Sequence, residues 1–164
     1  MADSENDSRP LFSLAIATTF GIGYVPVAPG TFGSAAGLAL WMLLPSSPGV
    51  QAAVIVALFV AGSFAGNVAE RHFGRTDPRQ VVVDEVMGML ITLFLNPVGV
   101  RGAFLGFLIF RAADVIKPYP ANRLERLHGG VGVMADDAMA AVYANLALRL
   151  CIWSSSHLVI WSLN

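Results

Sequence analysis

Outside the first nine residues, charged side chains fall mainly in two segments, residues 70–85 and 111–137, and apolar runs fill most of the rest of the chain. No charged residue lies between Arg9 and Glu70. The run from Val50 to Ala69 holds twenty residues without a charge, which as a helix would be about 30 Å long and could cross a bilayer. The pattern predicts an all-α chain that is membrane-embedded or membrane-associated.

Two shorter apolar runs flank the turn sequence Asn-Pro-Val-Gly at residues 96–99. Each run is about ten residues long, which is too short to cross a bilayer alone. We therefore expect a helical hairpin whose two ends return to the same side. This hairpin would place Asp84 and Glu85, before the first run, beside Asp114, after the second. A compact bundle of such hairpins is the predicted fold.

Glycine and proline are frequent in residues 21–34, which predicts a shaped loop followed by a helix that begins near Ser34. The hydroxyls of Thr31 and Ser34 would then lie at the positive end of that helix and could hold a phosphate. The alternative is that Thr31 or Ser34 is an ordinary N-cap. A second turn is predicted at residues 45–49, which read Pro-Ser-Ser-Pro-Gly.

The C-terminal third is expected to contain a short amphipathic helix over residues 119–127 and a final helix over residues 138–150. Asp136 and Asp137 directly precede an apolar run, so we expect them to open this final helix. Trp153 and Trp161 suit a membrane interface. Because most cations lie in the two charged segments, the positive-inside tendency predicts that both segments face the cytoplasm.

The first ten residues are polar and acidic and do not resemble a signal peptide, so we expect residues 1–10 to form a disordered tail and residues 11–164 to form one domain. The chain is 55% hydrophobic and 13% charged, against about 25% charged in ordinary soluble domains. Its net charge of −1 argues against nucleic-acid binding. The single cysteine, Cys151, excludes a disulfide within the chain and a cysteine-based zinc site.

Five acids at predicted helix ends are unusual in a chain so poor in charge. They are Asp84, Glu85, Asp114, Asp136 and Asp137. Clustered carboxylates repel one another unless a cation neutralises them, and oxygen ligands without histidine or cysteine favour Mg²⁺. Arg111 and Lys117, spaced with Asp114 at three-residue intervals on one helix face, could balance the charge of a phosphoryl group. Each acid alone could instead be a helix cap or a surface ion pair.

Taken together, the pattern favours hydrolysis or transfer of a phosphate on a lipid. A non-enzymatic small membrane transporter subunit is an alternative, although its charges would be expected within the membrane rather than at helix ends. A lipid phosphotransferase is the other alternative, because the residues alone do not separate transfer from hydrolysis.

Four blocks of sequence resemble the phosphatidylglycerophosphatase A family in order and approximate spacing. They are APGTFGS at 28–34, VDEVMGM at 83–89, FRAADVIKPYP at 110–120 and HGGVGVMADD at 128–137. The resemblance covers roughly residues 12 to 150. It implies a Mg²⁺-dependent, all-helical phosphatase of the cell inner membrane. Such an enzyme removes the terminal phosphate of phosphatidylglycerophosphate and leaves phosphatidylglycerol.

Together, the residue pattern and the resemblance suggest three overlapping sets of site residues. The metal ligands are drawn from Asp84, Glu85, Asp114, Asp136 and Asp137. The catalytic residues are Asp84, Asp114, Lys117 and Asp137. The phosphate-binding residues are Thr31, Ser34, Arg111 and Lys117. Which carboxylate acts as base, whether one or two ions bind, and whether the chain forms a homo-oligomer stay open.

The chain departs from the family pattern at residues 119–122, which read Tyr-Pro-Ala-Asn where the family often has an arginine at the last position. A head-group contact is then missing or supplied by Arg123. His128 stands where some members have proline, so we do not assign it as the general acid.

Overall fold

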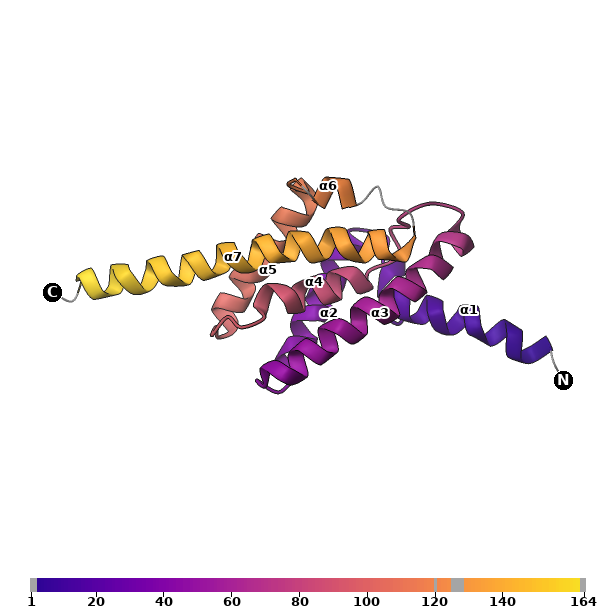
Figure 1. The fold of residues 1–164 in the computed structure, drawn as a ribbon, viewed down its shortest axis with the longest axis horizontal. Helices are drawn as coiled ribbons and strands as arrows, with labels where there is room; N and C mark the ends of the chain where they lie inside the picture. Colours follow the sequence, from indigo (N-terminus) through magenta and orange to yellow (C-terminus); the bar gives the residue numbers. More distant parts are fainter. Residues whose placement is uncertain (1–2, 120, 125–128, 163–164) are drawn as a thin grey trace.

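The structure is a computed structural model, and it describes residues 3–119, 121–124 and 129–162. Within these residues the chain is helical and contains no strand, which confirms the predicted all-α fold (Figure 1). The helices are α1 (Asp3–Ala17), η1 (Ile22–Tyr24), α2 (Pro29–Leu43), α3 (Pro48–Phe73), α4 (Val83–Leu93), α5 (Val100–Ile116), α6 (Ala121–Leu124) and α7 (Gly130–Ser162).

Three helix starts differ from the expectation. α1 begins at Asp3, so it covers most of residues 1–10, which we expected to be a disordered tail; acids in a first turn favour a helix through its dipole. α2 begins at Pro29 rather than near Ser34, because proline at the first helical position has a suitable φ and no N–H to satisfy. Ser34 therefore lies inside α2 and donates a hydrogen bond to the Gly30 carbonyl (2.9 Å) instead of capping the helix.

The third difference is at α7, which begins at Gly130, so Asp136 and Asp137 lie in its second turn and not at its head. The reason is a contact from a distant part of the chain. The side-chain oxygen of Asn67, on α3, accepts the backbone N–H of Gly130 at 2.9 Å and so satisfies one of the unpaired amides at the helix start. Part of the short helix predicted for residues 119–127 is present as α6, and residues 125–127 lie outside the described residues.

The predicted hairpin on either side of residues 96–99 is confirmed as α4 and α5. α4 is the short central helix and packs against α2, α3, α5 and α7. Its last carbonyls are satisfied by α7: the side-chain amide of Asn145 donates to the carbonyls of Ile91 (3.0 Å), Thr92 (3.0 Å) and Phe94 (2.8 Å). A helix end buried in an apolar bundle needs such partners.

Small residues let the helices approach closely around α4. A Cβ atom added at Gly37 of α2 would lie 2.6 Å from the Val86 carbonyl oxygen on α4, so only glycine fits there without a shift. On the other side, a Cβ atom at Gly66 of α3 would lie 2.8 Å from the Cα atom of Gly130 on α7. These contacts hold α2 against α4 and α3 against α7. Since α4 packs against both α3 and α7, the acidic residues of α4 and α7 come close together.

Two helices are long and apolar enough to cross a membrane by length and composition: α3 and the part of α7 from Gly130 to Ser154. α3 contains the apolar run predicted for this role. Large apolar side chains lie exposed along α3, among them Val56, Val60 and Phe64, of which Phe64 is 72% exposed. Exposed apolar surface of this kind suits contact with lipid. The C-terminal part of α7 and the N-terminal part of α1 extend from opposite ends of the bundle (Figure 1).

Candidate active site

A cavity of about 220 Å³ opens where α2, α4, α5 and α7 meet the connection between α3 and α4. We call it the site cavity. All five predicted acids and both predicted phosphate-binding cations line it. The lining residues are Ala28, Pro29, Gly30, Asp77, Arg79, Val81, Asp84, Glu85, Arg111, Asp114, Lys117, Asp136 and Asp137. Acids as far apart in the sequence as Asp77 and Asp137 therefore face one space.

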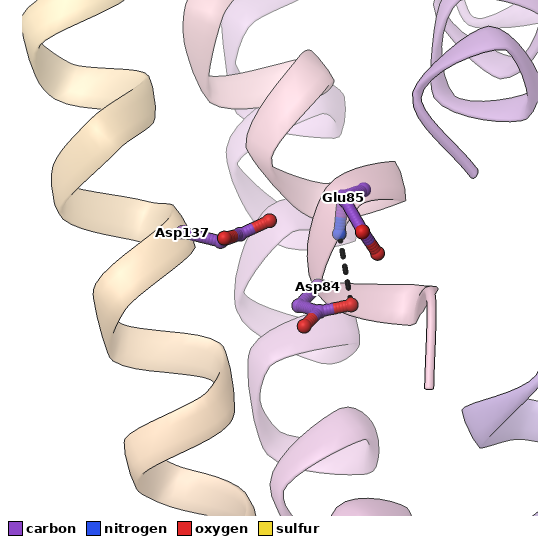
Figure 2. A group of neighbouring side chains, drawn as sticks. All are labelled: Asp84, Glu85 and Asp137. Atoms are coloured by element: carbon purple, nitrogen blue, oxygen red, sulfur yellow. Dashed lines mark hydrogen bonds between the residues drawn. The ribbon is translucent and has the colours of Figure 1, made fainter. Parts of the chain in front are cut away.

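Three of these acids form a tighter group, which we call the acid cluster: Asp84, Glu85 and Asp137. Each offers a carboxylate oxygen, and these oxygens all lie within 4.8 Å of one another. Asp84 and Glu85 come from the first turn of α4, and Asp137 points toward them from α7 (Figure 2). The backbone N–H of Glu85 donates to Asp84 Oδ1 at 3.1 Å. Glu85 Oε2 and Asp137 Oδ2 are buried without a hydrogen-bond partner.

The electrostatics of the acid cluster are unfavourable without a cation. Burial raises the pKa of the Asp84 carboxyl well above its ordinary value, and the charges of Glu85 and Asp137 raise it further. Burial also raises the pKa of Glu85, and the hydrogen bond with Asp84 and the charge of Arg111 offset part of that effect. Buried carboxylate oxygens without partners are costly, since an unsatisfied buried acceptor loses the hydrogen bonds it made to water.

The donor set fits a hard divalent ion. Such an ion binds oxygen atoms at about 2.0–2.6 Å, so oxygens on opposite sides of it are about 4–5 Å apart. The spacing within the acid cluster falls in this range, and the unpartnered oxygens of Glu85 and Asp137 are available to an ion. No nitrogen or sulfur ligand belongs to the group, which favours Mg²⁺ or a similar ion over zinc.

The other two predicted metal ligands are engaged with cations. Asp114 Oδ2 lies 2.7 Å from Arg111 Nη1, and Asp136 Oδ2 lies 2.6 Å from Lys117 Nζ. The same Arg111 nitrogen lies 3.8 Å from Glu85 Oε1 and donates to Ser34 Oγ at 3.3 Å.

Among the predicted phosphate-binding residues, the structure therefore joins Ser34 to the site through Arg111. Thr31 does not line the site cavity. His128 lies outside the described residues. Lys117 directly follows Ile116, the last residue of α5, and has a left-handed backbone conformation (φ 45°). The helix therefore ends before Pro118, and the Lys117 side chain lies at the cavity.

Six lining residues were not expected, and three of them bear on the chemistry of the site. Asp77 and Arg79 belong to the first charged segment, but nothing in their spacing indicates that the chain between α3 and α4 folds back over the acids. Gly30 is the third: a Cβ atom there would collide with Glu85 Oε1 and lie 3.2 Å from Arg111 Nη1. The glycine that follows Pro29 is therefore needed for the close approach of α2 to the site.

Comparison with known proteins agrees with this geometry. The family model for phosphatidylglycerophosphatase A matches residues 15–152. Phosphatidylglycerophosphatase A of Escherichia coli K12 is 36% identical, over 82% of this chain and 79% of its own length. The Haemophilus influenzae protein of the same name is 35% identical, over 83% of this chain and 85% of its own.

A protein of Bacteroides thetaiotaomicron described as a "Putative phosphatidylinositol-3-phosphatase" is 39% identical, over 88% of this chain and 97% of its own length. No solved structure matches the chain. The matched region includes every residue that lines the site cavity. The chain belongs to the phosphatidylglycerophosphatase A family and is a phosphatase.

Proposed function

We propose that this phosphatase hydrolyses the terminal phosphate monoester of phosphatidylglycerophosphate to phosphatidylglycerol, with Mg²⁺ bound by the acid cluster. The observation that carries the proposal is the cluster itself, two buried and one half-buried carboxylate with two buried oxygens that have no hydrogen-bond partner among the described residues, beside Arg111 and Lys117. The names of the family and of two relatives support the substrate.

The charge of the site cavity supports the requirement for a divalent ion. Its described lining includes six acids (Asp77, Asp84, Glu85, Asp114, Asp136 and Asp137) and three cations (Arg79, Arg111 and Lys117), a balance of −3 when all are ionised. A phosphate monoester carries a charge of about −1.5 to −2 near neutral pH. It would be repelled from such a cavity, and one bound divalent ion would reduce the balance from −3 to −1 and so weaken the repulsion.

Within this proposal the residues divide the work as follows. Asp84, Glu85 and Asp137 hold the ion, which supplies polarisation of a phosphoryl oxygen and neutralisation of its charge. Arg111 and Lys117 donate hydrogen bonds to the other phosphoryl oxygens and balance charge that develops during transfer. Asp114 and Asp136, through their short contacts with these two cations, keep them oriented toward the phosphate.

The membrane placement follows from the same features. The cations near the site cavity and the two helices able to cross a bilayer favour an enzyme of the cell inner membrane, with the site cavity at its cytoplasmic face. The substrate then remains in the lipid layer while its phosphorylated head group enters the cavity.

A second substrate has specific support. The Bacteroides relative, which matches over 88% of this chain, is described as acting on phosphatidylinositol 3-phosphate. That lipid also carries a phosphate monoester on a polyol that a phosphodiester joins to diacylglycerol. The two substrates therefore present the same reacting group to the site cavity.

The test is phosphate release by the purified protein in detergent, with each lipid, in Mg²⁺ and in EDTA. We expect Mg²⁺-dependent hydrolysis of phosphatidylglycerophosphate at the higher kcat/KM, and loss of at least 100-fold in Asp137→Asn. Folded Asp114→Asn and Asp137→Asn proteins with full activity would refute the site. Preference for the inositol lipid would assign the second substrate. A product containing an added alcohol acceptor would indicate a phosphotransferase, and flux into liposomes without phosphate release would indicate a transporter.

A further inference from the structure

Arg79 differs from the other two cations of the site cavity, each of which is in contact with an acid. Arg111 is in contact with Asp114 and Glu85, and Lys117 is in contact with Asp136. Within the described part of the chain, Arg79 makes no ion pair, although it lines the same cavity. Its guanidinium is therefore available to an anion from outside.

The backbone on either side of Arg79 is anchored. Pro78 and Val81 are buried, and the N–H of Val81 donates to the Pro78 carbonyl at 2.8 Å, which closes a turn around Arg79. The N–H of Val82 donates to the Ala17 carbonyl of α1 at 2.9 Å. Arg79 itself is exposed between these buried neighbours. The turn thus presents the side chain at the open side of the cavity, whereas the acid cluster lies at its buried side.

The substrates of the proposed function carry two phosphates of different kinds. The terminal monoester reacts, and a phosphodiester joins the polyol to diacylglycerol. When the monoester reaches the buried acid cluster, the phosphodiester must lie toward the lipid, at the open side of the cavity. A guanidinium can bind two phosphate oxygens at once, and its charge strengthens both hydrogen bonds.

We propose that Arg79 binds the phosphodiester of the substrate and so selects lipids that have one. This inference rests on the proposed function and adds the residue that recognises the second phosphate. It also predicts discrimination against phosphatidate, whose monoester is attached directly to diacylglycerol and which has no phosphodiester for Arg79 to bind.

The test compares kcat and KM for short-chain phosphatidylglycerophosphate and short-chain phosphatidate, in mixed micelles with Mg²⁺, for wild type, Arg79→Ala, Arg79→Lys and Arg75→Ala. Arg75 is an exposed arginine of the same connection that does not line the cavity, so it controls for the loss of surface charge. We expect Arg79→Ala to lower kcat/KM for phosphatidylglycerophosphate about 10- to 100-fold, mainly through KM, and for phosphatidate less than threefold. Arg79→Lys should recover part of the loss, and Arg75→Ala should behave as wild type.

A second measurement uses the product, which keeps the phosphodiester and lacks the monoester. Inhibition by short-chain phosphatidylglycerol should weaken about tenfold in Arg79→Ala and stay unchanged in Arg75→Ala. Equal losses on both substrates, or no loss on either, would overturn the role of Arg79. These outcomes are distinct from failure of the proposed function, which would show as a wild-type protein without activity on any of the lipids.

Discussion

Replacing Asp84 with asparagine should make the metal-free protein more stable while removing its activity. The two side chains have nearly the same shape, and asparagine keeps an oxygen that can accept the N–H of Glu85. The change removes one negative charge from the acid cluster. Because burial and the neighbouring acids already raise the pKa of Asp84, its ionised form opposes folding when no cation is bound.

The size of the effect can be bounded from the geometry. Two unit charges 4.8 Å apart, the upper limit of spacing in the acid cluster, repel by about 3.5 kcal/mol at an effective dielectric constant of about 20. The protein can escape this repulsion by protonating one carboxyl, which for an ordinary pKa of 3.8 costs about 4.4 kcal/mol at pH 7. We therefore expect Asp84→Asn to stabilise the metal-free protein by about 1 to 4 kcal/mol at pH 7.

The direction in which stability changes with pH follows from the raised pKa of Asp84. The stability of the wild type, relative to the variant, should fall as pH rises from the ordinary carboxyl pKa toward the raised value, because the folded state then holds a proton that the unfolded state has released. The difference between the two proteins should become small only well below the ordinary carboxyl pKa of 3.8, where the carboxyl is protonated in both states.

The assay is thermal unfolding in detergent with EDTA or with Mg²⁺. A gain of about 2 kcal/mol corresponds to an increase of about 4–8 °C in Tm for a domain of this size. Mg²⁺ should raise the Tm of the wild type and have little effect on Asp84→Asn. Asp114→Asn is the matched control: it removes a carboxylate that contacts Arg111, so it should bring no such gain. A variant less stable than wild type in EDTA, or equal stabilisation of both proteins by Mg²⁺, would refute the electrostatic argument.

Three other predictions test the site and its support. Gly30→Ala should lower kcat/KM at least tenfold, because the added methyl group would displace Glu85 and Arg111; unchanged kinetics would contradict the close approach of α2. The Mg²⁺ concentration for half-maximal activity should rise as pH falls from 8 to 6, because the ion competes with protons for carboxyls of raised pKa. The rise should be at most about tenfold per pH unit for each proton that the ion displaces. A half-maximal Mg²⁺ concentration that does not change with pH would contradict this competition. Asn145→Ala should lower Tm, with a loss of about 2 kcal/mol because the carbonyls of Ile91, Thr92 and Phe94 each lose a hydrogen bond, and leave KM unchanged, as unfolding and steady-state assays would show.

The hairpin was predictable because its evidence is local. Two apolar runs too short to cross a membrane and a clear turn between them require their outer ends to meet, which brings Asp84 and Glu85 to Asp114. The position of Asp137 beside Asp84 and Glu85 could be inferred only from the scarcity of charged residues in the chain. Its place in the second turn of α7 depends on Asn67, sixty-three residues before the helix start, and no pattern near the helix start indicates that contact.

The sequence also did not indicate which acids form the acid cluster and which pair with cations. Asp136 and Asp137 are adjacent along the chain, yet one contacts Lys117 and the other joins the acid cluster. Adjacent residues of a helix point about 100° apart, so neighbours can serve different partners. The position of Arg79 at the cavity was not predicted for a related reason. The turn that orients Arg79 is held by a contact with α1, which is distant in sequence.

α4 and α7 run in the same direction and meet at two points, with opposite consequences. At one end Asn145 ties α7 to the last carbonyls of α4, and about 12 Å earlier along α7 Asp137 faces Asp84 and Glu85. The hydrogen bonds of Asn145 hold the two helices together whether or not a cation is bound, whereas the carboxylates of the acid cluster repel one another until a cation binds. Any loosening of the metal-free bundle is therefore concentrated at the end of α4 that carries Asp84 and Glu85, while the opposite end stays attached to α7.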